Sequence, residues 1–167
     1  MKRLILFCSI SLLILHAGAQ SAGKTRTITT SFSKNGTTSG DTTFFSYNGQ
    51  SGALLRFFNR NLRIPMVNDT SEMEFGSCNL YFIIDTAGNV TKTWCDSVTN
   101  KAVEKEVLHV AGRLAPMKPT TIRGKPVVTK VMATVNMEHA NQGESYRKAD
   151  ILVIGYDTQY KKSTGRE

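Results

Sequence analysis

Residues 51–137 decide the fold, in four segments: SGALLRFFNRNLRIP (51–65), FGSCNLYFIIDTAGNVTKTWCDSV (75–98), KAVEKEVLHVAGRLAPMKP (101–119) and RGKPVVTKVMATVNM (123–137). Their periodicity and turn residues predict a helix, a β-hairpin, an amphipathic helix and a long last strand, in that order. The chain has 167 residues, which is enough for one domain with a modest core.

A sequence signal marks the end of the first predicted helix and the beginning of the second. The first, over 52–62, carries an apolar stripe at helical spacing, and Pro65 ends it by biasing the preceding residue away from helical geometry. The second starts at Asn100, a residue type that caps helix N-termini. Its predicted apolar face consists of Val103, Val107, Val110, Ala111 and Leu114.

The hairpin is predicted from alternation on both sides of the turn 85–88. In the first strand, alternate residues from Cys78 to Ile84 share one face, and Tyr81 and Ile83 share the other. Apolar residues on both faces favour a central position in the sheet. The returning strand, 89–97, alternates with one polar face, which is typical of a half-exposed strand.

Cys78 and Cys95 are the cysteines that remain outside the N-terminal segment. If Asp85 faces Gly88 across the turn, these two residues lie directly opposite each other on one face, close enough for a disulfide. A bulge at Gly88 would shift this register by one residue. Two buried, unbridged cysteines are the alternative.

The ends of the chain differ in composition from the middle. Residues 1–19 resemble a cleaved signal peptide, with Lys2 and Arg3 before an apolar run and Ala17-Gly18-Ala19 before Gln20. This predicts an exported, periplasmic protein; an uncleaved inner-membrane anchor is the alternative. Residues 20–51 form a polar arm, either flexible or loosely β. Residues 139–167 form a C-terminal extension with a short strand (149–156) and a basic tail.

Charge and residue spacing argue against two functional classes. The formal net charge is +8, but the basic residues are scattered, and nucleic-acid binding needs them clustered with interleaved aromatics. No histidine pair has metal-ligand spacing, and nothing resembles a nucleophile elbow. The sequence therefore predicts no enzyme activity, no metal site and no cofactor.

The ordered segments resemble the TonB C-terminal domain. The features that match are Asn61-Leu62-Arg63-Ile64-Pro65 closing the first helix, Gly76 opening the first strand, the hairpin 82–90, the second helix, and Pro119 followed by Gly124-Lys125-Pro126-Val127. Ile64 and Met117 depart from that pattern, which has aromatic residues there. The resemblance implies an α+β fold, with a small antiparallel sheet of about three strands packed by two helices over 52–138.

The resemblance also implies a partner and a mode of binding. Its partners are segments of outer-membrane TonB-dependent receptors, captured by strand addition to an exposed sheet edge. By position, the expected contacts are Arg63, Ile64, Pro65, Val127, Val128, Thr129, Lys130 and Val131. The alternative for the last strand is a paired core element. A homodimer is a further alternative for the partners of this chain.

Energy transduction itself is not expected. A relaxed chain of the length of the arm spans only ~30 Å, and all four prolines follow residue 64, so no stiff stalk is predicted. The sequence predicts a periplasmic binding module associated with receptor-mediated transport. The alternative is an exported structural or inhibitor-like interaction protein with the same fold.

Overall fold

The computed structural model describes residues 26–50, 52–66, 72–140 and 149–155, which form an α+β fold. The helices are α1 (Ala53–Asn61) and α2 (Lys101–Ala111), with a short 3-10 helix η1 (Phe32–Lys34). The main sheet contains β1 (Thr27–Ser31), β4 (Gly76–Ile84), β5 (Val90–Asp96), β8 (Val128–His139) and β9 (Ile151–Gly155). A small second sheet contains β2 (Thr38–Ser39), β3 (Thr42–Thr43), β6 (Thr121–Ile122) and β7 (Lys125–Pro126). The predicted signal peptide and basic tail lie outside the described residues.

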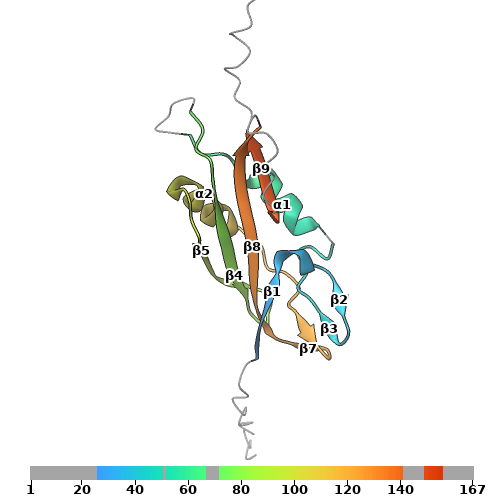
Figure 1. The fold of residues 1–167 in the computed structure, drawn as a ribbon. Helices are drawn as coiled ribbons and strands as arrows, with labels where there is room; N and C mark the ends of the chain where they lie inside the picture. The colour runs from blue at the N-terminus through green and yellow to red at the C-terminus, as the bar shows by residue number, and fades with distance from the viewer. Residues whose placement is uncertain (1–25, 51, 67–71, 141–148, 156–167) are drawn as a thin grey trace, which may run out of the picture.

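The main sheet has the order β1-β8-β4-β5, and β9 also pairs with β8. Strand β4 lies between β5 and β8 and is antiparallel to both, so its predicted central position is confirmed. On the other side of β8, β1 and β9 follow one another along the same edge, both parallel to it (Figure 1). The predicted sheet of about three strands is therefore too small, and the sheet is mixed.

The additional strands come from the segments outside the predicted domain. Strand β1 belongs to the polar arm, and β9 lies in the C-terminal extension. Arm residues also enter the core: Phe32 lies against Phe58, with ring centroids 5.9 Å apart, and Phe45 lies 6.3 Å from Phe82. The large aromatic side chains of the arm thus supply the burial that holds this polar segment in place.

Both predicted helices are confirmed, and they cover one face of the main sheet (Figure 1). Asn100 caps α2 by accepting a hydrogen bond from the backbone N–H of Ala102 at 2.8 Å. Helix α2 contacts β4 and β5, and α1 contacts β9. The core-facing residues of the sheet under these helices are Cys78, Leu80, Phe82, Ile84, Val131, Ala133, Val135 and Met137. The opposite face of the sheet carries no helix in the described part of the chain.

The turn between β4 and β5 fixes the position of the segment after α2. The Asp85 carboxylate accepts hydrogen bonds from the backbone N–H groups of Ala87 and Asn89, and those bonds, that of Asn89 first, lower the pKa of Asp85. Gly88 has a φ of +93°, and a Cβ there would lie 1.8 Å from the carbonyl oxygen of Met117. The Met117 N–H donates to the Gly88 carbonyl at 2.9 Å. Glycine is needed here for both backbone conformation and close approach.

The register of this hairpin differs from the predicted one. Leu80, not Cys78, lies opposite Cys95, and the register shifts between Ile83 and Ile84. The direct cross-strand pairing of the two cysteines is therefore wrong, because the loop is longer than assumed and a bulge follows it.

Among the described residues, no helix has the length and apolar composition needed to cross a membrane.

Candidate partner-binding surface

The last strand, which the sequence predicted as a binding edge, is paired on both sides. Residues Thr27–Ser31 of β1 pair with Val128–Met132 of β8, and β9 pairs with Val135–His139. The expected contact residues of this edge are divided between faces: Val127, Thr129 and Val131 are buried, while Val128 and Lys130 are partly exposed. The prediction of a free edge at Val127–Val131 is wrong, because the polar arm folds back and supplies the neighbouring strand.

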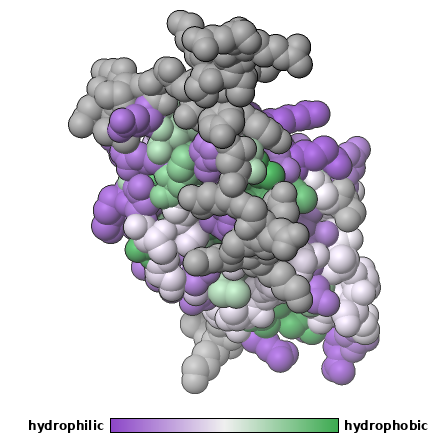
Figure 2. All heavy atoms as spheres, turned by 45° about the horizontal axis from the view of Figure 1, so that its top comes forward, coloured by the Kyte–Doolittle hydropathy of each residue, from purple (hydrophilic) through white to green (hydrophobic). Residues whose placement is uncertain are grey.

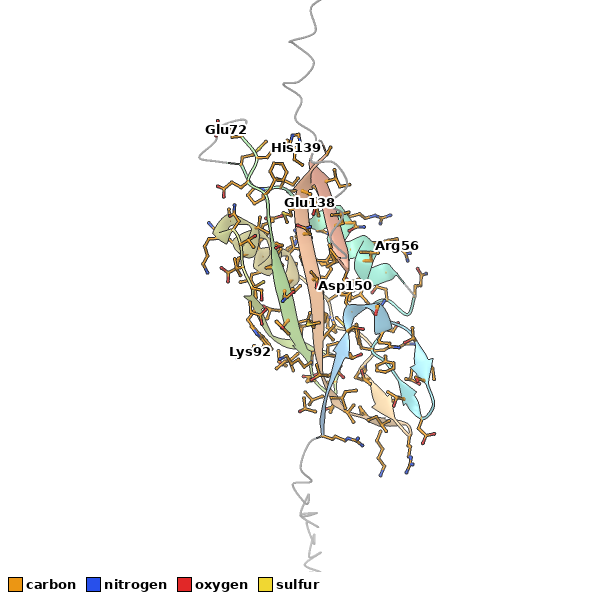
Figure 3. The ribbon with its side chains drawn as sticks, in the orientation of Figure 1. Arg56, Glu72, Lys92, Glu138, His139 and Asp150 are labelled. Carbon is orange, nitrogen blue, oxygen red and sulfur yellow. The ribbon has the colours of Figure 1, made fainter. Side chains whose placement is uncertain are left out.

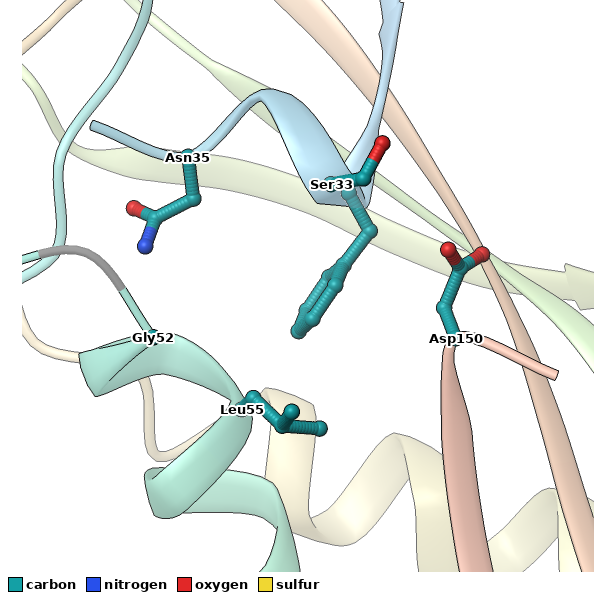
Figure 4. A pocket seen from close by; sticks show the side chains of 6 residues that line it. Ser33, Asn35, Gly52, Leu55 and Asp150 are labelled. Carbon is teal, nitrogen blue, oxygen red and sulfur yellow. The ribbon is translucent and has the colours of Figure 1, made fainter. Parts of the chain in front are cut away.

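The short gap between β1 and β9 is closed by a side chain. The backbone N–H of Thr134 donates to the Asp150 carboxylate at 2.9 Å. A pocket of about 230 Å³ lies beside this contact, lined by Phe32, Ser33, Asn35, Gly52, Leu55 and Asp150 (Figure 4). The Asn35 amide is already used, since its Oδ1 accepts a hydrogen bond from the backbone of Tyr47.

The other predicted contacts, Arg63, Ile64 and Pro65, lie elsewhere. A Cβ on Gly155 would lie 2.5 Å from Ile64 Cδ1, so Ile64 packs beside the end of β9, and Gly155 pairs with His139. At about 3.3 Å per residue, His139 is roughly 25 Å along β8 from Val131. The structure therefore does not bring the two groups of predicted contacts together.

Local contacts also occupy Arg63 and Pro65. The Arg63 guanidinium donates to the carbonyls of Arg60 and Leu62, and its backbone N–H donates to Glu106. The Pro65 carbonyl accepts a hydrogen bond from the Glu74 N–H at 2.8 Å. Each group has an intramolecular role at the end of α1.

The unpaired edge of the main sheet is β5. In the described part of the chain, this strand pairs with β4 alone. The direction of its backbone groups follows from the ladder: the Thr134 N–H points away from β4 toward Asp150, and Thr134 faces Asn79. Antiparallel pairs alternate between hydrogen-bonded and open positions. The backbone N–H and C=O groups of Asn79 therefore point toward β5 and bond with those of its neighbour Asp96.

The same alternation continues along β5. Trp94 and Lys92 direct their N–H and C=O groups toward β4, as Asp96 does. The backbone groups of Thr93 and Cys95 then point outward, away from the sheet. These two residues define the free edge of β5, and sequence alone gave no signal for it beyond the half-polar alternation of the strand.

An aromatic and cationic cluster lies on the open face of the sheet beside this edge. The rings of Tyr81 and Trp94 stack with centroids 5.2 Å apart and planes 10° apart. The Lys130 ammonium lies 4.6 Å from the Tyr81 centroid, and the Lys92 ammonium lies 5.2 Å from that of Trp94. Cation–π contacts of this kind hold both lysines over the rings. We call Tyr81, Trp94, Lys92 and Lys130 the aromatic–lysine cluster.

The Asp96 carboxylate borders one end of this cluster and affects the pKa of Tyr81. Loss of solvation, and then the hydrogen bond and the charge of Asp96, raise the pKa of Tyr81, so the phenol stays neutral. Asp96 also accepts a hydrogen bond from the Asn79 side chain at 3.1 Å. The cluster thus presents two cations over neutral rings, bordered by one carboxylate. The alternation of the first strand predicted that Tyr81 and Ile83 share a face, but it gave no signal for the stacking of Tyr81 on Trp94.

Cys78 and Cys95 are free thiols that contact each other diagonally across the two strands. Their hydrogen bond lowers the pKa of Cys78, because it stabilises the thiolate, and raises the pKa of Cys95, which keeps the shared proton. Burial and the nearby Glu104 and Asp96 charges further raise the pKa of Cys95. The disulfide stays a prediction.

Within the described residues, no three histidine, cysteine, aspartate or glutamate side chains gather closely enough to hold a metal ion. No protein-family model, curated protein or solved structure matches this chain.

Proposed function

We propose that this protein is an exported binding module that captures an extended segment of a partner protein at the free edge of β5. The observation that carries the proposal is the unpaired edge of β5 beside the aromatic–lysine cluster. Unpaired strand N–H and C=O groups are satisfied when an extended peptide adds as a further strand. The outward groups of Thr93 and Cys95 would supply this backbone pairing.

The aromatic–lysine cluster would supply side-chain selectivity. Alternate residues of an added strand face the same side as Trp94, so they would approach its ring and the Lys92 ammonium. This environment favours a segment whose side chains on that one face, at positions i and i+2, include both an apolar and an acidic residue. Aromatic side chains provide large contact area at low cost in conformational entropy.

The partner class comes from the resemblance to the TonB C-terminal domain. The order α1, β4, β5, α2 and β8 follows the order of segments that carries this resemblance. It suggests segments of outer-membrane receptors as partners, in the periplasm, without energy transduction by this chain.

The second candidate is an exported structural or inhibitor-like interaction protein. The occupied edge of β8 favours it, because β1 and β9 fill the position where the resemblance implies a receptor segment. Such a protein would bind through β5 or the open sheet face and would have no affinity for receptor segments.

Titration of the full chain with peptides from the N-terminal plugs of outer-membrane receptors distinguishes the two candidate functions.

A matched pair of variants tests whether the β5 edge is the binding surface. Thr93→Pro removes an outward N–H and spares the ladder to β4, so it is tolerable in an edge strand. We expect it to keep the fold and to weaken peptide binding by up to about tenfold, the loss of one strand hydrogen bond.

Trp94→Pro is the contrasting variant, because the N–H of Trp94 belongs to the ladder with β4. It should destabilise the fold itself. Unchanged peptide affinity of a folded Thr93→Pro variant would exclude β5 as the binding edge. Failure of every receptor peptide to bind, with capture of another periplasmic protein that is lost in Thr93→Pro, would favour the second candidate.

A further inference from the structure

A second surface, on α1, is separate from the β5 edge. Arg56 extends from α1 on one flank of the molecule, and Lys92 lies on the opposite flank (Figure 3). The hydrophobic residues visible in Figure 2 form separate small groups among hydrophilic ones. Arg56 and Arg60 are exposed and one helical turn apart. Beside them is a hollow of about 380 Å³, between α1 and the turn 47–50.

The lining of this hollow is cationic and neutral. It includes both arginines together with Tyr47, Gln50, Phe57 and Asn61, and it contains no carboxylate. The ion pairs of Lys101 with Glu104 and of Arg123 with Asp41 lie outside this hollow. Neither guanidinium of the hollow is within ion-pair distance of a described acidic side chain.

The walls of the hollow are fixed by packing and hydrogen bonds. Tyr47 is 7% exposed, and its ring lies 5.4 Å from that of Phe57. One guanidinium N–H of Arg56 donates to Gln50 Oε1 at 3.0 Å, which orients the group and leaves its other donors available. The Asn61 amide donates to the Phe57 carbonyl at 2.7 Å. An entering ligand would meet donors held over an aromatic wall.

We infer that this hollow is an anion site for a phosphate monoester or pyrophosphate group. Residues four apart on a helix have Cβ atoms about 6 Å apart, so two guanidinium forks can converge on one such group. Guanidinium binds phosphate oxygens in bidentate fashion, and two cations match the charge of a phosphate dianion better than that of one carboxylate. The site is independent of the proposed strand addition at β5.

The phosphate could be free in solution or carried by a lipid headgroup. Calorimetric titration of the full chain with inorganic phosphate and pyrophosphate tests the first source. Co-sedimentation with phosphatidylcholine vesicles that contain phosphatidic acid, against vesicles of phosphatidylcholine alone, tests the second. Both use physiological ionic strength, because scattered surface charge is largely screened there.

The double variant Arg56→Gln/Arg60→Gln and the control Arg113→Gln complete the design. Arg113 is an exposed arginine just beyond the end of α2, outside the hollow. We expect the double variant to lose about tenfold or more in affinity for at least one ligand, and the control to change it less than about twofold. Absence of binding to every ligand would overturn the inference, as would equal losses in the control. Circular dichroism checks that the variants remain folded.

Discussion

Substitution of Gly88 by alanine tests how the turn between β4 and β5 is locked to the segment after α2. Alanine at a φ of +93° would cost about 1–2 kcal/mol for the left-handed conformation. Its Cβ would also lie 1.8 Å from the Met117 carbonyl oxygen, so the backbone of one segment must move. That movement would weaken the hydrogen bond from Met117 N–H to Gly88, worth about 1 kcal/mol. The expected loss of unfolding free energy is about 2–4 kcal/mol.

Gly124 supplies the matched control, with a φ of +73° and no atom within 4 Å of an added Cβ. Gly124→Ala should cost only the conformational term, about 1–2 kcal/mol. Urea unfolding followed by far-ultraviolet circular dichroism measures both variants. Equal losses for the two would refute the reasoning, because the close approach of Met117 would then contribute nothing. A loss below about 1 kcal/mol for Gly88→Ala would refute the turn geometry as well.

Three further outcomes follow from the hydrogen bonds and contacts of the fold. Asn100→Ala removes both the cap of α2 and the hydrogen bond from the Asn100 amide to the Phe75 carbonyl, and should lower the unfolding free energy by about 1–2 kcal/mol, measured by urea titration, whereas Asn100→Asp keeps only the cap and should recover part of this loss. Because the pKa of Asp85 is lowered in the folded protein, the Asp85 carboxylate should stabilise the fold above about pH 4, and this stabilisation should decline as the pH falls through the pKa of the folded state. Asp85→Asn should remove this pH dependence from the urea midpoint of unfolding. An unchanged pH profile in the variant would exclude a stabilising role of the Asp85 carboxylate. Peptide mapping without reductant should show Cys78 linked to Cys95 in exported protein, and free thiols under oxidising conditions would exclude the bond.

Local signals predicted the parts of the fold that local interactions determine. The cap at Asn100 and the apolar stripe from Val103 to Ala111 define α2 within the sequence itself, and the structure confirms them. The faces of β4 followed from alternation in the same way. The register of the hairpin did not, because the shift between Ile83 and Ile84 has no sequence marker of its own.

The pairing of β8 with β1 could not be predicted from the sequence for another reason. Strand β1 is rich in threonine, with Ile28 its sole aliphatic hydrophobic residue, so its pattern resembles that of a polar linker. Its pairing with β8 joins residues about a hundred positions apart, and tertiary contacts rather than local preference stabilise it. For the same reason, the sequence pattern predicts a binding edge at β8 and gives little sign of the free edge at β5.

Amide hydrogen exchange, with and without a receptor plug peptide, tests the central claim most directly. In the free protein, the outward N–H groups of Thr93 and Cys95 should exchange fast, while the neighbouring Trp94 N–H, bonded to β4, should be protected. Bound peptide should protect Thr93 and Cys95 and leave the β8 amides that face β1 unchanged. Protection confined to β8, with release of β1, would contradict binding at β5 and place the partner on the edge that the arm now covers.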